Sequence, residues 1–106
     1  FNKIVILFCD NIKFSLNINK CIQKLPGHAG NVAGLDFIPN EELIISGSND
    51  GSIKIWDFYF RTLKFTIPSA HAGYYVFSIC YIKDTAYFAS GGNDGYVRLW
   101  YYNNFS

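Results

Sequence analysis

The chain has 106 residues, of which 50% are hydrophobic and 16% are charged, and its net charge at pH 7 is +1. Its lysines and arginines are scattered singly, so they form no basic stripe of the kind that binds nucleic acid or an anionic membrane. No apolar run approaches the about 20 residues that span a bilayer. So apolar a composition favours strands covered on both faces, or a piece of a longer polypeptide.

The first 25 residues predict the last strands of a degenerate preceding unit. Apolar runs separated by turn residues indicate strands at 4–8, 12–16 and 21–25. The chain begins with Phe1 rather than Met, within this predicted unit, and we therefore expect it to be a fragment of a longer protein.

Two further units follow, at residues 26–67 and 68–106. The first is predicted to be complete, with a loop at 26–30 and four strands at 32–38, 43–46, 53–56 and 62–67. The second repeats this order with strands at 76–82, 86–90 and 96–100, and its final strand is incomplete. The sequence shows no helical period, linker or low-complexity tract, so an all-β fold is predicted.

One motif occurs twice, at 46–56 and 90–100, and the offset is 44 residues at every matched pair. The copies read SGSNDGSIKIW and SGGNDGYVRLW. Asn-Asp-Gly between two β-branched runs is a strong hairpin signal, because these residues tolerate the positive φ angles of a tight turn. Self-similarity at this period is typical of repeat architectures.

These motifs resemble the WD40 repeat, in which Gly-His, Ser-Gly-x-x-Asp and Trp-Asp recur in that order. The first copy contains Gly27-His28, 46–50 and Trp56-Asp57. The second departs from the pattern only at Ala70, before its His, and at Tyr101, after its Trp. The resemblance implies a β-propeller fragment of about two to three four-stranded antiparallel blades, which does not close into a ring.

The same resemblance implies a hydrogen-bonded tetrad of His, Ser, Asp and Trp inside each blade. The predicted tetrads are His28, Ser46, Asp50, Trp56 and His71, Ser90, Asp94, Trp100. A Ser-His-Asp hydrolase using Ser46 or Ser90 is the competing interpretation. The set occurs twice, neither serine lies in a Gly-x-Ser-x-Gly elbow, and no oxyanion hole is indicated. We therefore expect a structural role and no enzymatic activity.

Other kinds of site have weak signals. The glycine-rich 91–95 segment lacks the Gly-Lys-Ser/Thr of a phosphate-binding loop, and the Asn-Asp-Gly turns lack calcium-loop spacing. Two His and three Cys lie too far apart in sequence for a zinc site. Cys9, Cys21 and Cys80 are predicted to be buried free thiols in a reducing compartment. No cofactor or metal is expected.

The resemblance implies a non-catalytic scaffold that binds proteins or peptides in an intracellular multiprotein complex. The cytoplasm is the expected compartment, with nucleus and cilium left open, and the remaining blades of the parent chain are expected partners. A targeting or regulatory module of a larger enzyme is the alternative. The candidate binding residues lie at the loops before the first strands and at the second-to-third-strand turns: Asn31, Asn49, Tyr74, Tyr75 and Asn93.

Overall fold

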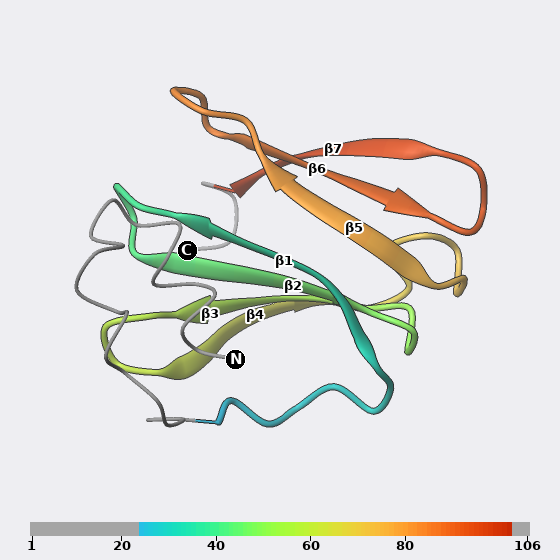
Figure 1. Cartoon of the computed structure of the whole chain (residues 1–106), viewed down its shortest axis with the longest axis horizontal. Helices are drawn as coiled ribbons and strands as arrows, with labels where there is room; N and C mark the ends of the chain where they lie inside the picture. Colours follow the sequence, from blue (N-terminus) through green and yellow to red (C-terminus); the bar gives the residue numbers. More distant parts are fainter. Residues whose placement is uncertain (1–23, 103–106) are drawn as a thin grey trace, which may run out of the picture.

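The computed structural model describes residues 24–102, in which seven β-strands form two antiparallel sheets (Figure 1). The first sheet contains β1 (Val32–Ile38), β2 (Leu43–Ser48), β3 (Ile53–Asp57) and β4 (Thr62–Ile67). The second contains β5 (Val76–Tyr81), β6 (Tyr87–Gly92) and β7 (Val97–Tyr101). In each sheet the strands pair in chain order, and the described residues contain no α-helix.

The all-β expectation is confirmed, because the strands of both sheets lie within two residues of their predicted ends. The strands expected at 4–8 and 12–16 lie outside the described residues. So does most of the one expected at 21–25, whose last two residues are described as irregular backbone.

The apolar run at the start of β2 is explained by burial on both faces of the first sheet. Leu43 and Ile45 belong to a core cluster shared with the second sheet, whereas Ile44 packs with Phe37 and Trp56 on the opposite face. A strand covered on one face only would alternate apolar and polar residues. The unbroken run therefore marks a central strand between two apolar layers.

The two sheets have the same local irregularities at matching positions, in addition to the same order of strands. A β-bulge lies between Val32 and Gly34 in β1, and another lies at the matching place in β5. Gly51 and Gly95 both adopt φ of +88°, which a residue with a Cβ rarely adopts. The repeated Asn-Asp-Gly therefore encodes the same left-handed turn residue in both hairpins.

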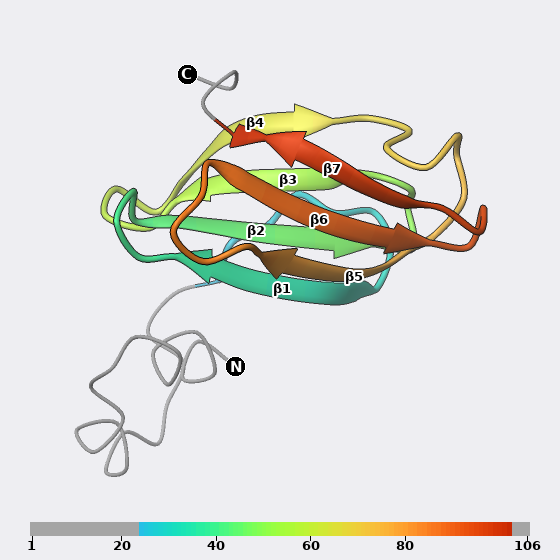
Figure 2. The same ribbon diagram turned by 90° about the horizontal axis from the view of Figure 1, so that it is seen from above.

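The sheets stack closely where β1 runs beside β5, and Figure 2 shows the second sheet lying across the first. A Cβ atom on Gly34 would lie 2.8 Å from the backbone nitrogen of Ile79, so only glycine fits there without a shift. Beside this contact, Asp36 Oδ2 accepts a hydrogen bond of 2.6 Å from the backbone N–H of Tyr81. This bond joins the two sheets directly.

The outer face of the second sheet is open, although the matching face of the first is covered. Ile53 and Ile55 are 0% exposed, whereas Val97 and Leu99, at the same positions of the repeat, are 77% and 65% exposed. The fragment is therefore an open stack of two blades rather than a closed ring.

The prediction of a buried thiol is wrong for Cys80, which is free and exposed. Side chains alternate along β5, and Ile79, 8% exposed, takes the position that faces the core. Cys80 consequently points away from the first sheet. Cys9 and Cys21 lie outside the described residues.

We expect Gly34→Ala to lower the free energy of unfolding by about 1–3 kcal/mol, because the new methyl group forces β1 and β5 apart. Urea unfolding of the intact protein measures this change. Ala33→Ser, at the exposed neighbouring position of the same strand, is the matched control and should be nearly silent. Equal stability of both variants would show that the close approach of the sheets is dispensable.

Candidate functional site

Four side chains from separate elements meet at the loop end of the first sheet. His28 lies in the loop before β1, Ser46 on β2, Asp50 in the β2–β3 turn and Trp56 on β3. His28 Nε2 lies 2.7 Å from Ser46 Oγ, and His28 Nδ1 lies 3.0 Å from Asp50 Oδ2. Trp56 Nε1 donates to Ser46 Oγ over 2.9 Å. The predicted tetrad side chains therefore form one continuous chain of hydrogen bonds.

The second sheet contains the same arrangement. His71 Nε2 lies 2.7 Å from Ser90 Oγ, and His71 Nδ1 lies 2.8 Å from Asp94 Oδ1. Trp100 Nε1 donates to Ser90 Oγ over 2.9 Å. His71 is fully buried, but Trp100 is only half-buried whereas Trp56 is buried, so the second network is less enclosed at its tryptophan.

The direction of the protons along each chain follows from what each group can donate. An indole nitrogen only donates, so the serine oxygen accepts from Trp56 or Trp100 and gives its own proton to Nε2 of the histidine. Nδ1–H of the histidine is then left to donate to the carboxylate, which accepts only. Each polar side-chain atom of a tetrad thereby has a hydrogen-bond partner, as the stability of buried polar groups requires.

Asp50 accepts more hydrogen bonds than the motif alone predicts. Burial raises the pKa of its carboxyl, but the hydroxyl and backbone N–H of Ser52 donate to it over 2.7 and 2.8 Å. The backbone N–H of Ala29 adds a bond of 2.9 Å, and His28 adds the last. These bonds outweigh burial and hold the pKa well below its usual range. An aspartate in a turn often accepts from the backbone N–H two residues on, as Asp50 does from Ser52 and Asp94 from Tyr96, and sequence reasoning missed this Asx-turn signal.

The pKa of the Asp94 carboxyl is also lowered, but by different hydrogen-bond donors. Burial of the carboxyl raises its pKa, but Arg98 Nη2 donates to Oδ2 over 2.9 Å and His71 donates to Oδ1. Together with the backbone N–H of Tyr96 they hold the pKa well below its usual range. Arg98 was not predicted as a member of this network; it lies four residues after Asp94, on the strand that leaves the turn.

The geometry is unsuited to a serine nucleophile. Ser46 and Ser90 are 4% and 3% exposed, and each oxygen already accepts a hydrogen bond from a tryptophan. A nucleophile must present its oxygen to substrate beside donors for the developing oxyanion. The arrangement therefore ties strand ends to a loop, and it gives a substrate no route to the serine oxygen.

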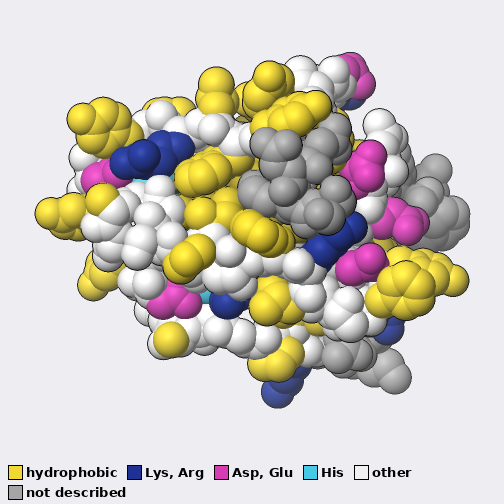
Figure 3. Space-filling view, turned by 180° about the vertical axis from the view of Figure 1, so that it is seen from behind, with side chains coloured by type: hydrophobic (Ala, Val, Ile, Leu, Met, Phe, Trp, Pro, Cys, Tyr) yellow, Lys and Arg dark blue, Asp and Glu magenta, His cyan; other side chains and the backbone are white. Residues whose placement is uncertain are grey.

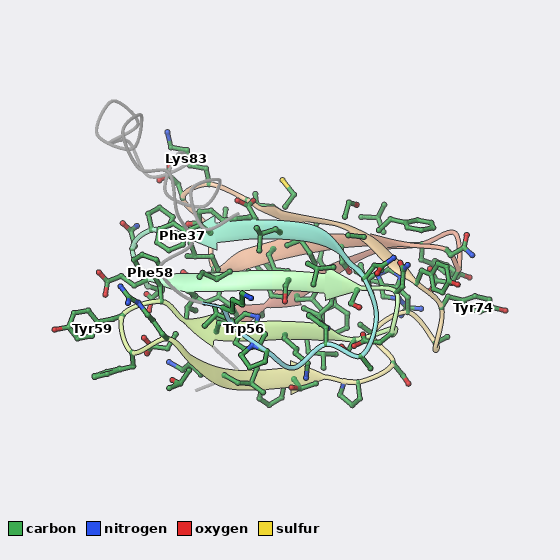
Figure 4. The ribbon with its side chains drawn as sticks, turned by 60° about the horizontal axis from the view of Figure 1, so that its bottom comes forward. Phe37, Trp56, Phe58, Tyr59, Tyr74 and Lys83 are labelled. Carbon is green, nitrogen blue, oxygen red and sulfur yellow. The ribbon has the colours of Figure 1, made fainter. Side chains whose placement is uncertain are left out.

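The residues predicted to bind a partner lie around these networks. The backbone N–H of Asn49 donates to the carbonyl of Asn31 over 2.9 Å, and that of Asn93 donates to Tyr75 over the same distance. Asn31 and Tyr75 are thus equivalent, which puts the additional residue of the second loop before Tyr75. Tyr74 points outward at the end of the molecule opposite Phe58 and Tyr59 (Figure 4).

Within residues 24–102, no group of three or more His, Cys, Asp or Glu side chains is arranged to hold a metal ion. No helix in this part of the chain is long and apolar enough to cross a membrane.

We expect Trp56→Ala to cost about 3–5 kcal/mol in the free energy of unfolding, because Trp56 is 4% exposed and its loss leaves a cavity and removes the indole donor of Ser46. Thermal or urea unfolding of the intact protein measures the loss. Asn49→Ala, in the neighbouring turn, should stay within about 0.5 kcal/mol of the wild type. A variant lacking the indole that unfolds like the wild type would contradict the structural role of the tetrad.

We expect an acid-dependent loss of stability that Asp50→Asn reduces. The pKa of Asp50 is lower in the folded than in the unfolded state, so its carboxylate stabilises the fold above the unfolded pKa of about 3.9. That contribution disappears as the pH falls below this value. Urea unfolding at a series of pH values should therefore give a flatter profile for the variant, while exposed Asp84→Asn should follow the wild type. Parallel profiles for all three proteins would contradict the expectation.

Comparison with known proteins matches this geometry to a family. The sequence model of the WD40 family (WD domain, G-beta repeat) matches residues 19–57 and 61–101. The second match begins at the residue before β4, which pairs within the first sheet, so the sequence repeat and the sheet are out of phase. The fold resembles the crystal structure of the computationally designed Ika4 protein, with a TM-score of 0.64 and 26% identity. That alignment covers 84% of this chain and 52% of the designed one.

Curated relatives are much longer than this chain. It is 32% identical over 84% of its length to mouse WD repeat and FYVE domain-containing protein 1, of which it spans 22%. It is 51% identical over 38% of its length to Pre-mRNA-processing factor 17 of Saccharomyces cerevisiae, of which it spans 9%. Proteins of this family are generally non-catalytic interaction scaffolds. Two matched repeats, two repeated hydrogen-bond networks and two equivalent sheets establish that the chain belongs to the WD40 repeat family and forms part of a β-propeller.

Proposed function

We propose that this chain is a non-catalytic scaffold that binds protein partners in an intracellular multiprotein complex. The observation that supports this proposal is that the loop end of the sheets has a backbone fixed by hydrogen bonds but exposed aromatic side chains. Backbone hydrogen bonds fix the turns at Asn49 and Asn93, while Tyr74 and Tyr75 remain 54% and 47% exposed. Rigid loops with free aromatic side chains are well suited to binding, because little ordering entropy is lost on contact.

The proposed binding surface consists of Asn31, Asn49, Tyr74, Tyr75 and Asn93. Tyrosine is enriched among residues that dominate binding energy, and asparagine supplies both a donor and an acceptor. The relatives support an intracellular setting, since one is named as a pre-mRNA-processing factor. Compartment and partner identity are part of the proposal for this chain.

The open face of the second sheet requires a different partner. Val97 and Leu99 of β7 are 77% and 65% exposed on this face. Hydrophobic side chains are also spread widely over the molecule seen from behind (Figure 3). In the first sheet the equivalent face, with Ile53 and Ile55, is covered by the second sheet. We infer that the remaining blades of the parent chain cover the second sheet in the same way, since an apolar face of this kind is rarely left in water.

Tyr74→Ala combined with Asn49→Ala tests the scaffold proposal in the intact protein, purified from its own cells. We expect the double variant to lose co-purifying proteins while its unfolding temperature stays unchanged, because both side chains contribute to the surface and little to the core. Tyr59→Ala, at the opposite end and 70% exposed there, is the control and should retain them. Undiminished co-purification with the double variant, or loss with Tyr59→Ala alone, would contradict the proposed surface.

A further inference from the structure

The open face of the second sheet lies on the side away from the first sheet (Figure 1) and is built from the same repeat positions as the covered face of the first. Gly47 and Ile55 of the covered face correspond to Gly91 and Leu99 of the open face. The covered face has a blade packed on it, so a further blade is the occupant that the open face matches. We name the contact between the two described sheets the first interface, and the contact between the open face and that further blade the second interface.

The close approach of backbones in the first interface depends on Gly34. A Cβ atom there would lie 2.8 Å from the backbone nitrogen of Ile79 and 2.9 Å from the Cα of Ser78. In the second sheet the position of Gly34 is taken by Ser78, since each of the two residues pairs with the equivalent glycine of its neighbouring strand. The serine side chain therefore prevents the next blade from approaching β5 as closely as β5 approaches β1.

The space over these two paired glycines is also filled differently. A Cβ atom on Gly47 would lie 2.5 Å from Cγ1 of Val76 and 3.2 Å from Cγ1 of Ile79, so side chains of the second sheet occupy that space. A Cβ atom on Gly91 would lie 2.8 Å from Oγ of Ser78, which belongs to the same sheet as Gly91. The hydroxyl group thus takes the room that apolar side chains of the neighbouring blade take in the first interface.

The hydrogen bond that joins the two described sheets has no counterpart on the open face. Asp36 Oδ2 accepts from the backbone N–H of Tyr81 over 2.6 Å. Cys80 occupies the equivalent position in the pairing of β5 with β6. A thiol is a weak hydrogen-bonding group, and that of Cys80 donates over 3.5 Å to the carbonyl of Tyr81 in its own strand. The next blade is consequently offered no carboxylate by β5.

We propose that the second interface is the weaker of the two, and that the intact propeller opens locally there more readily than at the first interface. The proposal rests on the inference that the remaining blades cover the open face. Close backbone packing, apolar side chains seated over a glycine and a hydrogen bond to a carboxylate all stabilise the first interface. Their counterparts are missing on the β5 side of the second. Local opening occurs where fewer such contacts have to be broken.

Native-state labelling of single cysteines with N-ethylmaleimide compares the two interfaces in the intact protein. Ile55→Cys places a thiol in the first interface, and Leu99→Cys places one at the equivalent position of the second. Both are made together with Cys80→Ala, and mass spectrometry reads the labelling rate of each peptide separately. We expect Leu99→Cys to be labelled about tenfold faster than Ile55→Cys, because the reagent reaches each thiol only when its interface opens. Tyr59→Cys, at a site 70% exposed in the wild type, gives the rate without protection and should exceed both.

Giving the second interface the residues of the first tests the cause of the difference. Ser78→Gly with Cys80→Asp should slow the labelling of Leu99→Cys about tenfold, because the close approach and the carboxylate acceptor are then restored. The same pair of changes should leave the rate of Ile55→Cys as it was, since that thiol lies in the other interface.

Equal labelling rates at Ile55→Cys and Leu99→Cys, both slower than Tyr59→Cys, would overturn the proposal while the cover of the open face stands. A rate at Leu99→Cys that is unchanged by Ser78→Gly with Cys80→Asp would overturn it too, because the named residues would not set the difference. Labelling of Leu99→Cys as fast as that of Tyr59→Cys would show that no blade covers the open face. The inference on which the proposal rests would then be wrong, and the proposal with it.

Discussion

The buried serine hydroxyl is the interaction on which the rest of each blade depends. Ser46 and Ser90 each accept from a tryptophan on one strand and donate to a histidine of the preceding loop. One small side chain thereby joins the centre of a sheet to a loop that has no strand of its own. Because the group is buried, leaving it unpaired would cost more than the bonds contribute when made. The loop is consequently held in one position, and the neighbouring surface residues are held with it.

A second constraint joins one blade to the next. Gly34 lets the backbones of β1 and β5 approach, and Asp36 accepts a hydrogen bond from the facing sheet. The repeat of the sequence is also out of phase with the sheet, since the second matched repeat begins beside β4 of the first sheet. Neither blade is therefore an independent unit. This dependence accounts for the apolar face that the second sheet leaves open in the described part of the chain.

The networks and the surface have complementary roles in the proposed function. The polar groups that carry charge at the loop end, including Asp50 and Asp94, are occupied in holding the loops. Recognition is then left to neutral and aromatic groups. The second repeat has Tyr75 and Phe77 where the first has Asn31 and Ala33, so the two blades share one framework but offer different surfaces. A repeat fold allows this, because a loop residue can change without altering the core.

The sequence alone determined the all-β class and the strand positions, because these follow from local periodicity and a motif that occurs twice. The membership of the two tetrads followed from the family resemblance that this motif carries. The sequence left out what depends on contacts between distant segments. The bond from Tyr81 to Asp36 and the exposure of Cys80 are of this kind, whereas the support of Asp94 by Arg98 is local and depends on the geometry of the turn between them. Ser52 joined the Asp50 network through a turn whose local signal was missed. Which apolar residues are covered was likewise decided only by the tertiary structure: Ile55 and Leu99 are nearly identical in sequence context, yet only Ile55 has a sheet packed against it. At these two positions burial depends on what packs against the strand, and the similar patterns of β3 and β7 do not distinguish them.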